Sequence, residues 1–522
     1  MAYTWKKDRA LARVRARLAE VEIVEIKTYV RDTNLNALPR NKAYRVDGVH
    51  VYVDILNLED MLGTTDVEGV ICHRRTLRFL NLHYRAVHRI LGAVDAIEVD
   101  FHNQRLHTVV TKPYGDEAGR VHRAIAIAQL IIDVLAQTGE EGDEIIPAAK
   151  VRVGIDTGLA LAVRNGRRGH SEPLFLGEPA NRAAKRAGGG RSTGIYLTNT
   201  ARHAIGLADA ANEDTTRLTG DEVNVSQDEA ELDTTADKIV REWRKDLDAN
   251  PIGKFSFSGH TPPFSNLDLE LLSPANSRRQ DAISIYGDLD GFTNYVAKHV
   301  ANDETAKDVV RVLHVLRSEM DSVVTTDFGG RKIRFIGDCI HAALAEGTAQ
   351  TTDEEASVST AILCAGGLRS SFELALEELG DNDVDVEGLG LQIGFELGPL
   401  ALTRLGLKGA MVRCAVGRCV LGSEAEQLRC KSEETAIGET AHGWASEAAQ
   451  KIFGKSRKRG GLTYAIALSE LEGGGDTVAK SSAALARAAT GSGLLSTPAA
   501  AATGDYRFPA HNAAPAKPLG FA

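Results

Sequence analysis

Two aspartates that follow strand-like runs have the side chains best suited to chemistry. Asp288 lies in Tyr-Gly-Asp-Leu-Asp-Gly-Phe-Thr at 286–293, and Asp338 lies 50 residues later (338 − 288) in Arg-Phe-Ile-Gly-Asp-Cys at 334–339. An aspartate that ends a strand presents its carboxylate beside free backbone N–H groups, and a second aspartate in a neighbouring hairpin turn can face it. Two convergent carboxylates can hold the divalent cations that bridge a nucleoside triphosphate. The pair predicts metal-dependent phosphate chemistry; the alternative is that both aspartates only cap turns.

The elements that must position these aspartates alternate between strand-like and helical runs. The first strand-like run is 49–53, a helical stretch covers about 65–94, and two strand candidates lie within 96–112. A second helical stretch at 121–137 precedes a β-branched run at 150–156 that returns after a glycine turn. This alternation predicts a sheet protein of the α/β or α+β class.

An internal repeat relates the two halves of the chain. Residues 151–158 resemble 391–398 at an offset of 240 (398 − 158), and residues 52–55 resemble 286–289 at an offset of 234 (288 − 54). The same offsets relate Gly169 to Gly409, Gly177 to Gly417, Phe101 to Phe335 and His107 to His341. The sequence therefore predicts one fold written twice. We call residues 45–205 copy one and residues 280–450 copy two.

Charge and composition exclude several classes of protein. The chain has 522 residues, enough for about three domains, with 71 acidic against 61 basic residues. This balance argues against a protein whose main partner is nucleic acid. The six cysteines form no CxxC pair, and no apolar run resembles a signal-peptide core or approaches the roughly 18 residues of a membrane span. We therefore expect a cytoplasmic protein that does not contact membranes directly.

Shifts in composition divide the chain into five parts. The stretch 207–265 is polar and acidic, and glycine, alanine, serine, threonine and proline dominate after about Glu472. We expect a charged N-terminal lead-in at 1–43, a first domain at 44–206, an acidic linker at 207–278, a second domain at 279–470 and a disordered tail at 471–522.

The motifs of both copies resemble those of the class III nucleotidyl cyclases. Residues 288–293 resemble the family signature Asp-Ile-x-Gly-Phe-Thr, and 335–338 resemble its Ile-Gly-Asp hairpin with the second metal-binding aspartate. Residues 176–186 are similar to its Gly-x-x-x-Asn-x-Ala-x-Arg helix. The resemblance covers most of both copies. It implies an α+β fold with two tandem ferredoxin-like βαββαβ cyclase domains, packed head to tail as an intramolecular pseudo-dimer.

The resemblance also implies roles for individual residues. Asp288 and Asp338 would hold two divalent ions, Mn²⁺ or Mg²⁺, while Asn181 would orient the ribose and Lys185 would stabilise charge at the α-phosphate. The family usually has arginine at the Lys185 position, and Arg186 is the less suitable substitute because it lies about 140° around the helix from Asn181. Backbone N–H groups of the strand-to-helix turn would cradle the β- and γ-phosphates; its residues are Leu289, Asp290, Gly291, Phe292 and Thr293.

The two copies differ at these positions in complementary ways. In copy one Asp54 matches the first metal-binding aspartate, but Gln104 replaces the second. In copy two Leu421 stands at the position of Asn181, and an alanine stands at that of Lys185. Because sites of this family form between two head-to-tail domains, we expect one competent site that uses aspartates of copy two and the helix of copy one. The second site, at Asp54 and Gln104, would be degenerate.

The positions that select the base depart from the pattern of adenylate cyclases. That pattern has a lysine four residues before the hairpin aspartate, and copy one has Asp100 at this position. The pattern also has an aspartate seven residues before the helix asparagine, and copy one has Leu174 there. Asp100 is an acceptor that suits the N3–H of uracil or the amine of cytosine. Tyr52 and Tyr286, each two residues before the first aspartate of its copy, would narrow the pocket; alternatively they are ordinary strand packing.

These departures make the chain resemble the bacterial pyrimidine cyclases of antiphage (Pycsar-type) defence. The resemblance implies conversion of UTP to 3′,5′-cyclic UMP and pyrophosphate, and a downstream effector that the cyclic nucleotide activates. Three alternatives remain: a cytidylate cyclase that makes cyclic CMP, a purine (adenylate or guanylate) cyclase, and a non-catalytic tandem module that binds a nucleotide. The pseudo-dimer does not require a homodimer, and the sequence leaves association of two chains open.

Overall fold

The computed structural model describes most of the chain. The described residues are 3–31, 33–35, 38–63, 65–140, 146–165 and 173–491. Gly169, which helped to define the repeat, and residues 492–522 of the expected tail lie outside them. Within the described residues, no helix is both long and apolar enough to cross a membrane.

Copy one is built on a seven-stranded sheet whose centre is the antiparallel pair of β2 (Lys42–Ile55) and β5 (Val151–Arg164). Their register runs from Tyr44 opposite Ala162 to Ile55 opposite Val151. Both strands are rich in β-branched residues, which suit a buried pleated sheet. The strand order is β3-β4-β2-β5-β6, with β1 beside β2 and β7 beside β5. These other strands are β1 (Glu25–Thr28), β3 (Ile97–His102), β4 (Arg105–Val110), β6 (Pro173–Leu176) and β7 (Gly194–Leu197).

Copy two repeats this plan in an eight-stranded sheet. Its central antiparallel pair is β9 (Ser277–Asp290) and β12 (Gly390–Leu405), and the strand order is β10-β11-β9-β12-β14-β15, with β13 beside β12 and β8 beside β9. The other strands are β8 (Phe257–Ser258), β10 (Arg331–Ile336), β11 (Cys339–Leu344), β13 (Val412–Val416), β14 (Glu434–Ile437) and β15 (Lys458–Gly460). The order of the four leading strands is the same in both sheets, which confirms the repeat predicted from the sequence.

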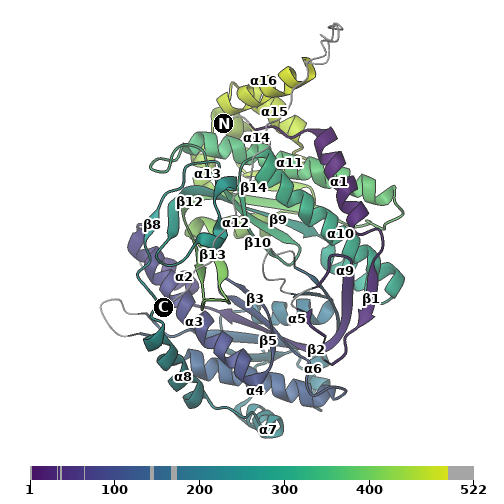
Figure 1. Cartoon of the computed structure of the whole chain (residues 1–522), viewed down its shortest axis with the longest axis vertical. Coiled ribbons are helices and arrows are strands. Elements are labelled where there is room, and N and C mark those ends of the chain that lie inside the picture. Colours follow the sequence, from purple (N-terminus) through teal and green to yellow (C-terminus); the bar gives the residue numbers. More distant parts are fainter. Residues whose placement is uncertain are drawn as a thin grey trace, which may run out of the picture.

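Helices cover both sheets, and Figure 1 shows copy one, in purple to blue, below copy two, in green. The helices of copy one are α2 (Leu58–Leu62), α3 (Val70–Val94), α4 (Glu117–Leu135), α5 (Glu178–Ala187) and α6 (Asn199–Ala204). Those of copy two are α9 (Phe292–His299), α10 (Asp303–Ser322), a π-helical turn at Val323–Asp327, α11 (Glu354–Gly380), α12 (Arg418–Leu428), α13 (Glu439–Trp444) and α14 (Glu447–Phe453). The mixture of helices with two mainly antiparallel sheets is the expected α+β class.

Each copy contributes a hairpin to the hydrophobic core of the other. Leu161 and Leu174, from the β5–β6 hairpin of copy one, lie in the core of copy two. Leu405 and Val412, from the β12–β13 hairpin of copy two, lie in the core of copy one. Burial of apolar side chains is worth about 25 cal/mol per Å². This reciprocal exchange therefore couples the folding of the two copies.

The N-terminal lead-in is ordered and packs on copy two. Its helix α1 (Lys7–Glu20) places Val14 in the core of copy two and Arg13 between two buried carboxylates. Arg13 contacts Glu319 and, with a 2.8 Å ion pair, Asp327. After α1 the chain crosses to copy one, where β1 joins β2. The first 43 residues therefore link both copies.

The structure differs from the expected acidic linker between the copies. Residues 207–278 contain α7 (Gly220–Ala230), α8 (Ala236–Ala249) and two short 3₁₀ helices at Phe264–Asn266 and Leu269–Leu271. The acidic side chains of α8 lie outside, whereas its inner face buries Ile239, Val240 and Trp243 in the core of copy one. Net charge concealed this amphipathic pattern, which is what makes the segment fold.

The expected disordered tail also begins with ordered structure. The helix α15 (Tyr464–Gly473) is followed by α16 (Thr477–Gly491), and Ala479 is buried in the core of copy two. The reason is that alanine, which dominates this stretch, has the highest intrinsic helix propensity.

Candidate functional site

A cavity of about 210 Å³ lies between the two copies. Its wall combines residues of α5 and the sheet of copy one with residues of α9 and the β10–β11 turn of copy two. Six residues singled out in the sequence line it: Tyr52, Asp100, Asn181, Phe292, Thr293 and Asp338. The cavity therefore brings residues of both copies together, and of the four residues expected to act on the substrate and metal, Asn181 and Asp338 line it while Asp288 and Lys185 do not.

The two aspartates of copy two lie close enough to interact. Asp288 is on β9, and Asp338 is in the turn after β10. Burial, followed by the charge of Asp290, raises the pKa of Asp288 to about 6. Burial and then the charge of Asp288 raise the pKa of Asp338 well above its ordinary value. A cation would stabilise these two carboxylates, one at the end of β9 and one in the turn after β10, because they repel each other.

This donor set fits a divalent metal bound jointly by protein and substrate. Among the described residues no cluster of three or more histidine, cysteine, aspartate or glutamate side chains could hold an ion alone. Mg²⁺ and Mn²⁺ in nucleotide sites typically take one or two carboxylates and complete their shell with phosphate oxygens and water. Asp288 and Asp338 match that pattern. The side chain of Gln427 also donates to Asp288 Oδ2 at 3.3 Å and so helps to orient the carboxylate.

The turn from β9 into α9 is shaped by glycine. Gly291 has a φ of +76°, and a Cβ there would lie 2.1 Å from the carbonyl oxygen of Gly388. Asp290 is held on both sides, since its Oδ1 accepts from the backbone N of Gly291 at 3.0 Å and its Oδ2 from that of Ser432 at 3.0 Å. This turn leaves Phe292 and Thr293 on the cavity wall, whereas Leu289 is buried in the core.

Asn181 reaches the cavity because α5 packs directly on β5. A Cβ on Gly154 of β5 would lie 2.1 Å from the carbonyl oxygen of Ala183, so only glycine allows this approach. Lys185, one turn after Asn181, is exposed and is not part of the cavity wall. Arg186, the weaker alternative to Lys185, pairs with Glu213 and Asp214 at 3.0 and 3.1 Å. The structure therefore favours Lys185 over Arg186 as the cation that can turn toward the cavity.

The two tyrosines have different surroundings. The ring of Tyr52 lines the cavity and stacks on His107, with centroids 4.0 Å apart and planes at 15°. His107 in turn contacts His50, with 3.0 Å between Nε2 and Nδ1. Tyr286 stacks on His341 in the equivalent way, but it is buried in the core and does not line the cavity. Of the two tyrosines expected near the base, Tyr52 lines the cavity and Tyr286 does not.

Asp100, which the sequence analysis expected to accept from a base, also has a charged partner within the protein. Asp100 lines the cavity, but it forms an ion pair with Arg334, which also donates to the carbonyl oxygen of Phe101. The side chain of Arg334 is 2% exposed, so its charge depends on this partner. Any acceptor that Asp100 offers to a ligand is therefore shared with Arg334.

The sequence analysis missed Arg317, which lies beside the cavity. Arg317 on α10 donates from Nη2 to Asn165 Oδ1 at 2.7 Å and to its carbonyl oxygen at 3.1 Å, and Asn165 lines the cavity. The guanidinium of Arg317 lies 3.9 Å above the ring of Phe335, and burial lowers its pKa to about 9. The only signal in the sequence was an arginine among the apolar positions of a helix. His107, which supports Tyr52, carried a clearer signal, because it belongs to the repeat.

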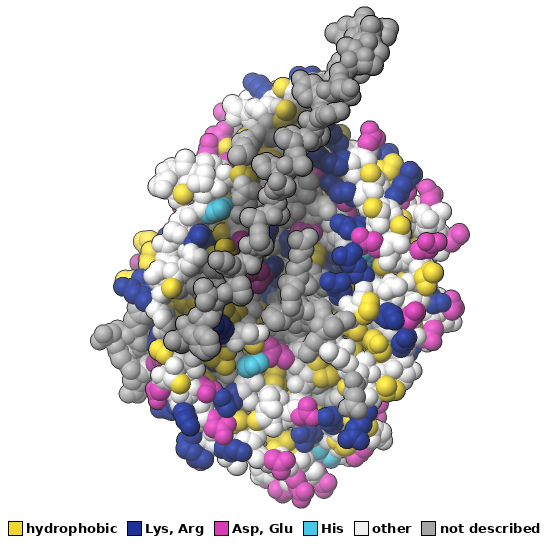
Figure 2. All heavy atoms as spheres, in the orientation of Figure 1, with side chains coloured by type: hydrophobic (Ala, Val, Ile, Leu, Met, Phe, Trp, Pro, Cys, Tyr) yellow, Lys and Arg dark blue, Asp and Glu magenta, His cyan; other side chains and the backbone are white. Residues whose placement is uncertain are grey.

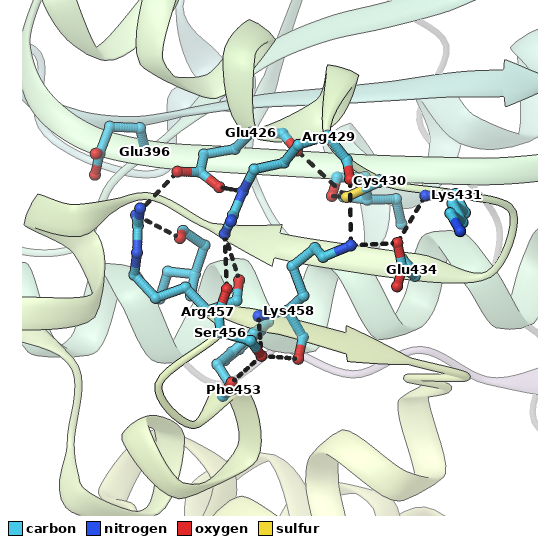
Figure 3. Close-up of polar contacts among 12 residues, drawn as sticks. Glu396, Glu426, Arg429, Cys430, Lys431, Glu434, Phe453, Ser456, Arg457 and Lys458 are labelled. Carbon is cyan, nitrogen blue, oxygen red and sulfur yellow. Dashed lines mark hydrogen bonds and ion pairs between the residues drawn. The ribbon is translucent and has the colours of Figure 1, made fainter.

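The surroundings of Asp54 and Gln104, where the degenerate second site was expected, differ from those of Asp288 and Asp338. Beside Asp54 and Gln104, Arg105 forms a 3.1 Å ion pair with Glu424 of α12. The end of α12 is tied down as well: Figure 3 shows Arg429 and Arg457 converging on Glu426, with 2.9 Å between Arg457 Nη1 and Glu426 Oε1. Arg105, next to Gln104, is thus engaged with Glu424, whereas the buried Oδ1 of Asp54 has no hydrogen-bond partner among the described residues.

Comparisons with known proteins agree with this geometry. No protein-family model matches the chain. A uridylate cyclase of Pseudomonas aeruginosa is 58% identical over 484 residues, which cover 92% of this chain and 94% of that protein. A uridylate cyclase of a Rhizobium species is 39% identical over 433 residues, which cover 80% of this chain and 82% of that protein.

A solved structure extends this similarity to the fold. The crystal structure of a class III adenylyl cyclase-like ATP-binding protein from Pseudomonas aeruginosa is 58% identical and superimposes with a TM-score of 0.88. The match covers 90% of this chain and all of that chain.

Proposed function

Because this chain belongs to the class III nucleotidyl cyclases, and within them to the family of the uridylate cyclases, we propose that it converts UTP into 3′,5′-cyclic UMP and pyrophosphate. The observation that carries the proposal is the cavity between the copies, where Asn181 of copy one and Asp338 and Thr293 of copy two share a wall. The site is then composite, and the chain acts as an intramolecular pseudo-dimer.

In this reaction the ribose 3′-oxygen forms a bond to the α-phosphorus, the bond to the bridging oxygen of pyrophosphate breaks, and the 3′-hydroxyl loses its proton. Divalent ions held by Asp288 and Asp338, Mn²⁺ or Mg²⁺, would supply charge neutralisation and a lower pKa of the 3′-hydroxyl. Asn181 holds the ribose by a hydrogen bond, which orients the 3′-oxygen. Lys185 places positive charge near the α-phosphate.

The remaining groups hold the two ends of the nucleotide. The backbone N–H groups that open α9, next to Gly291, bind the β- and γ-phosphates. The stacked Tyr52–His107 pair forms a flat side of the cavity against which the pyrimidine ring packs. Asp100 lines the cavity wall, and its carboxylate, which also pairs with Arg334, accepts from the N3–H of uracil.

The biological setting follows from the product. We propose that cyclic UMP serves as a second messenger of antiphage defence in the cytoplasm and activates a separate effector. The names of both curated relatives support UTP over CTP and over a purine nucleotide. A binding module without turnover is the remaining alternative, and activity measurements decide it.

The experiment is incubation of the purified chain with Mn²⁺ or Mg²⁺ and each of UTP, CTP, ATP and GTP in turn. Cyclic product and pyrophosphate are measured by mass spectrometry. We expect cyclic UMP with UTP and much less product with the other three. Cyclic CMP as the main product would show that the substrate is CTP and not UTP. The absence of any product would favour the binding module.

A further inference from the structure

A second cavity, of about 240 Å³, lies beside α10 and includes Arg317 in its lining. It is lined by parts of the chain distant in sequence: the N-terminal lead-in, the end of β5 in copy one, and α10 and β10 in copy two. Its charged lining residues are Arg17, Arg40, Arg164, His314, Arg317, Asp321 and Lys332. Figure 2 shows lysine and arginine side chains gathered on this face, over α1 and α10.

The charges of this second cavity do not cancel. Arg17 and Arg40 share the single carboxylate of Glu20, at 2.7 and 2.6 Å. Lys332 is neutralised by Asp321. Arg164 and Arg317 form no ion pair with any residue in the described part of the chain. Counting Glu20 and Asp321 against the five lysine and arginine side chains leaves three net positive charges around one hollow.

Arg317 is the strongest single indication of a ligand. It is 5% exposed, and its Nε has no hydrogen-bond partner among the described residues; the buried Nε of Arg164 has none there either. A buried guanidinium with unsatisfied donors is costly, and the lowered pKa of Arg317 reflects that cost. The planar fork of arginine matches the oxygens of phosphate groups, and the stacked ring of Phe335 fixes the fork in place.

We propose that this second cavity binds an oligophosphate group, either free pyrophosphate or tripolyphosphate or the phosphate tail of a nucleotide. Three net charges fit two or three linked phosphates better than one inorganic phosphate. The site is separate from the proposed reaction, because it contains none of the residues placed at the catalytic centre. It adjoins that centre, since Arg317 also holds Asn165 of the catalytic cavity.

The test is equilibrium binding of pyrophosphate, tripolyphosphate and UTP to the full-length chain in EDTA, which suppresses metal-dependent binding at the catalytic site. The inactive Asp338→Ala variant serves as the parent, so that turnover plays no part. We expect saturable binding of about one oligophosphate per chain. Arg164→Glu in that parent should weaken it at least tenfold, and Arg317→Lys should weaken it less.

A matched control separates this site from general charge attraction. Lys307→Glu changes the same charge on α10, outside the second cavity, and should leave binding unchanged. Binding of pyrophosphate or tripolyphosphate would identify a free oligophosphate as the ligand. Binding of UTP but of neither free anion, again lost in Arg164→Glu, would identify the phosphate tail of a nucleotide as the ligand. Absence of saturable binding, or equal loss with Lys307→Glu and Arg164→Glu, would overturn the proposal. Because none of these measurements depends on turnover, they stand apart from the test of the proposed function.

Discussion

Asp100 and Arg334 occupy equivalent positions in the two copies, at the repeat offset of 234 (334 − 100), and form an ion pair with each other. Asp100 is on β3 and Arg334 on β10, so one pair joins the two sheets. Two identical residues at this position would face each other as like charges or as two uncharged groups. The divergence of the copies at this position therefore gives a contact that a symmetric repeat could not form.

Loss of one partner should destabilise the chain more than loss of both. Asp100→Ala leaves the buried Arg334 without its carboxylate, which typically costs about 3–5 kcal/mol. The double variant Asp100→Ala/Arg334→Ala removes the unpaired charge and should recover a large part of the loss. Urea unfolding of the single and double variants measures this. Additive effects of the two substitutions would show that the pair is not coupled.

Removal of Arg13 should release the N-terminal helix from copy two. Arg13→Ala leaves Glu319 and Asp327 buried beside each other, and we expect a loss of about 3–5 kcal/mol in unfolding free energy. Arg15→Ala is the control, because Arg15 is largely exposed in its pair with Glu378 and its loss should change the unfolding free energy much less. Equal unfolding midpoints for the two variants would contradict a structural role of the lead-in.

Acid should destabilise the fold through buried neutral histidines. Burial lowers the pKa of His50 and His341 to about 3 and that of His83 to about 4. In the unfolded chain these groups bind protons near pH 6.5, so the stability that they provide is present above that pH and is lost as pH falls toward 4. The loss is on the order of 3 kcal/mol per histidine over this interval.

Urea unfolding between pH 7.5 and 4.5 measures this dependence. We expect the midpoint to fall steadily below pH 6.5 and to fall less in His83→Gln, whose amide can still donate to the carbonyl oxygen of Phe79. A midpoint that does not change between pH 6.5 and 4.5 would show that these histidines are protonated in the fold.

The glycine under α5 should be necessary for the site. A Cβ on Gly154 would meet α5 backbone at 2.1 and 2.4 Å, so Gly154→Ala pushes the helix and Asn181 away from the cavity. We expect a loss of activity of at least tenfold together with a lower unfolding midpoint. Gly92→Ala is the control, because a Cβ there meets nothing within 4 Å. Full activity of Gly154→Ala would show that the position of α5 is not critical.

Repeat positions allowed much of this site to be predicted from the sequence. The motif around Asp288 and the helix of Asn181 could be recognised because they resemble cyclase motifs, and Tyr52 because it recurs as Tyr286 at the offset of 234. The partner of Asp100 could not, since Arg334 reaches it only through the packing of two sheets. Arg317 and Asn165 meet for the same reason, from positions 152 residues apart. The acidic stretch before copy two was misjudged because its apolar face is short and its net charge is high.

The most direct test of a composite site within one chain is complementation between two inactive variants. Asn181→Ala removes the contribution of copy one, and Asp338→Ala removes that of copy two. Each substitution alone should abolish cyclic UMP formation and leave the unfolding midpoint close to that of the parent chain. Asp54→Asn, at the degenerate side, should retain most of the activity. If the site forms within one chain, an equimolar mixture of the two inactive variants stays inactive. Recovery of activity in the mixture would show that the site forms between chains, and activity of Asn181→Ala alone would contradict the composite site itself.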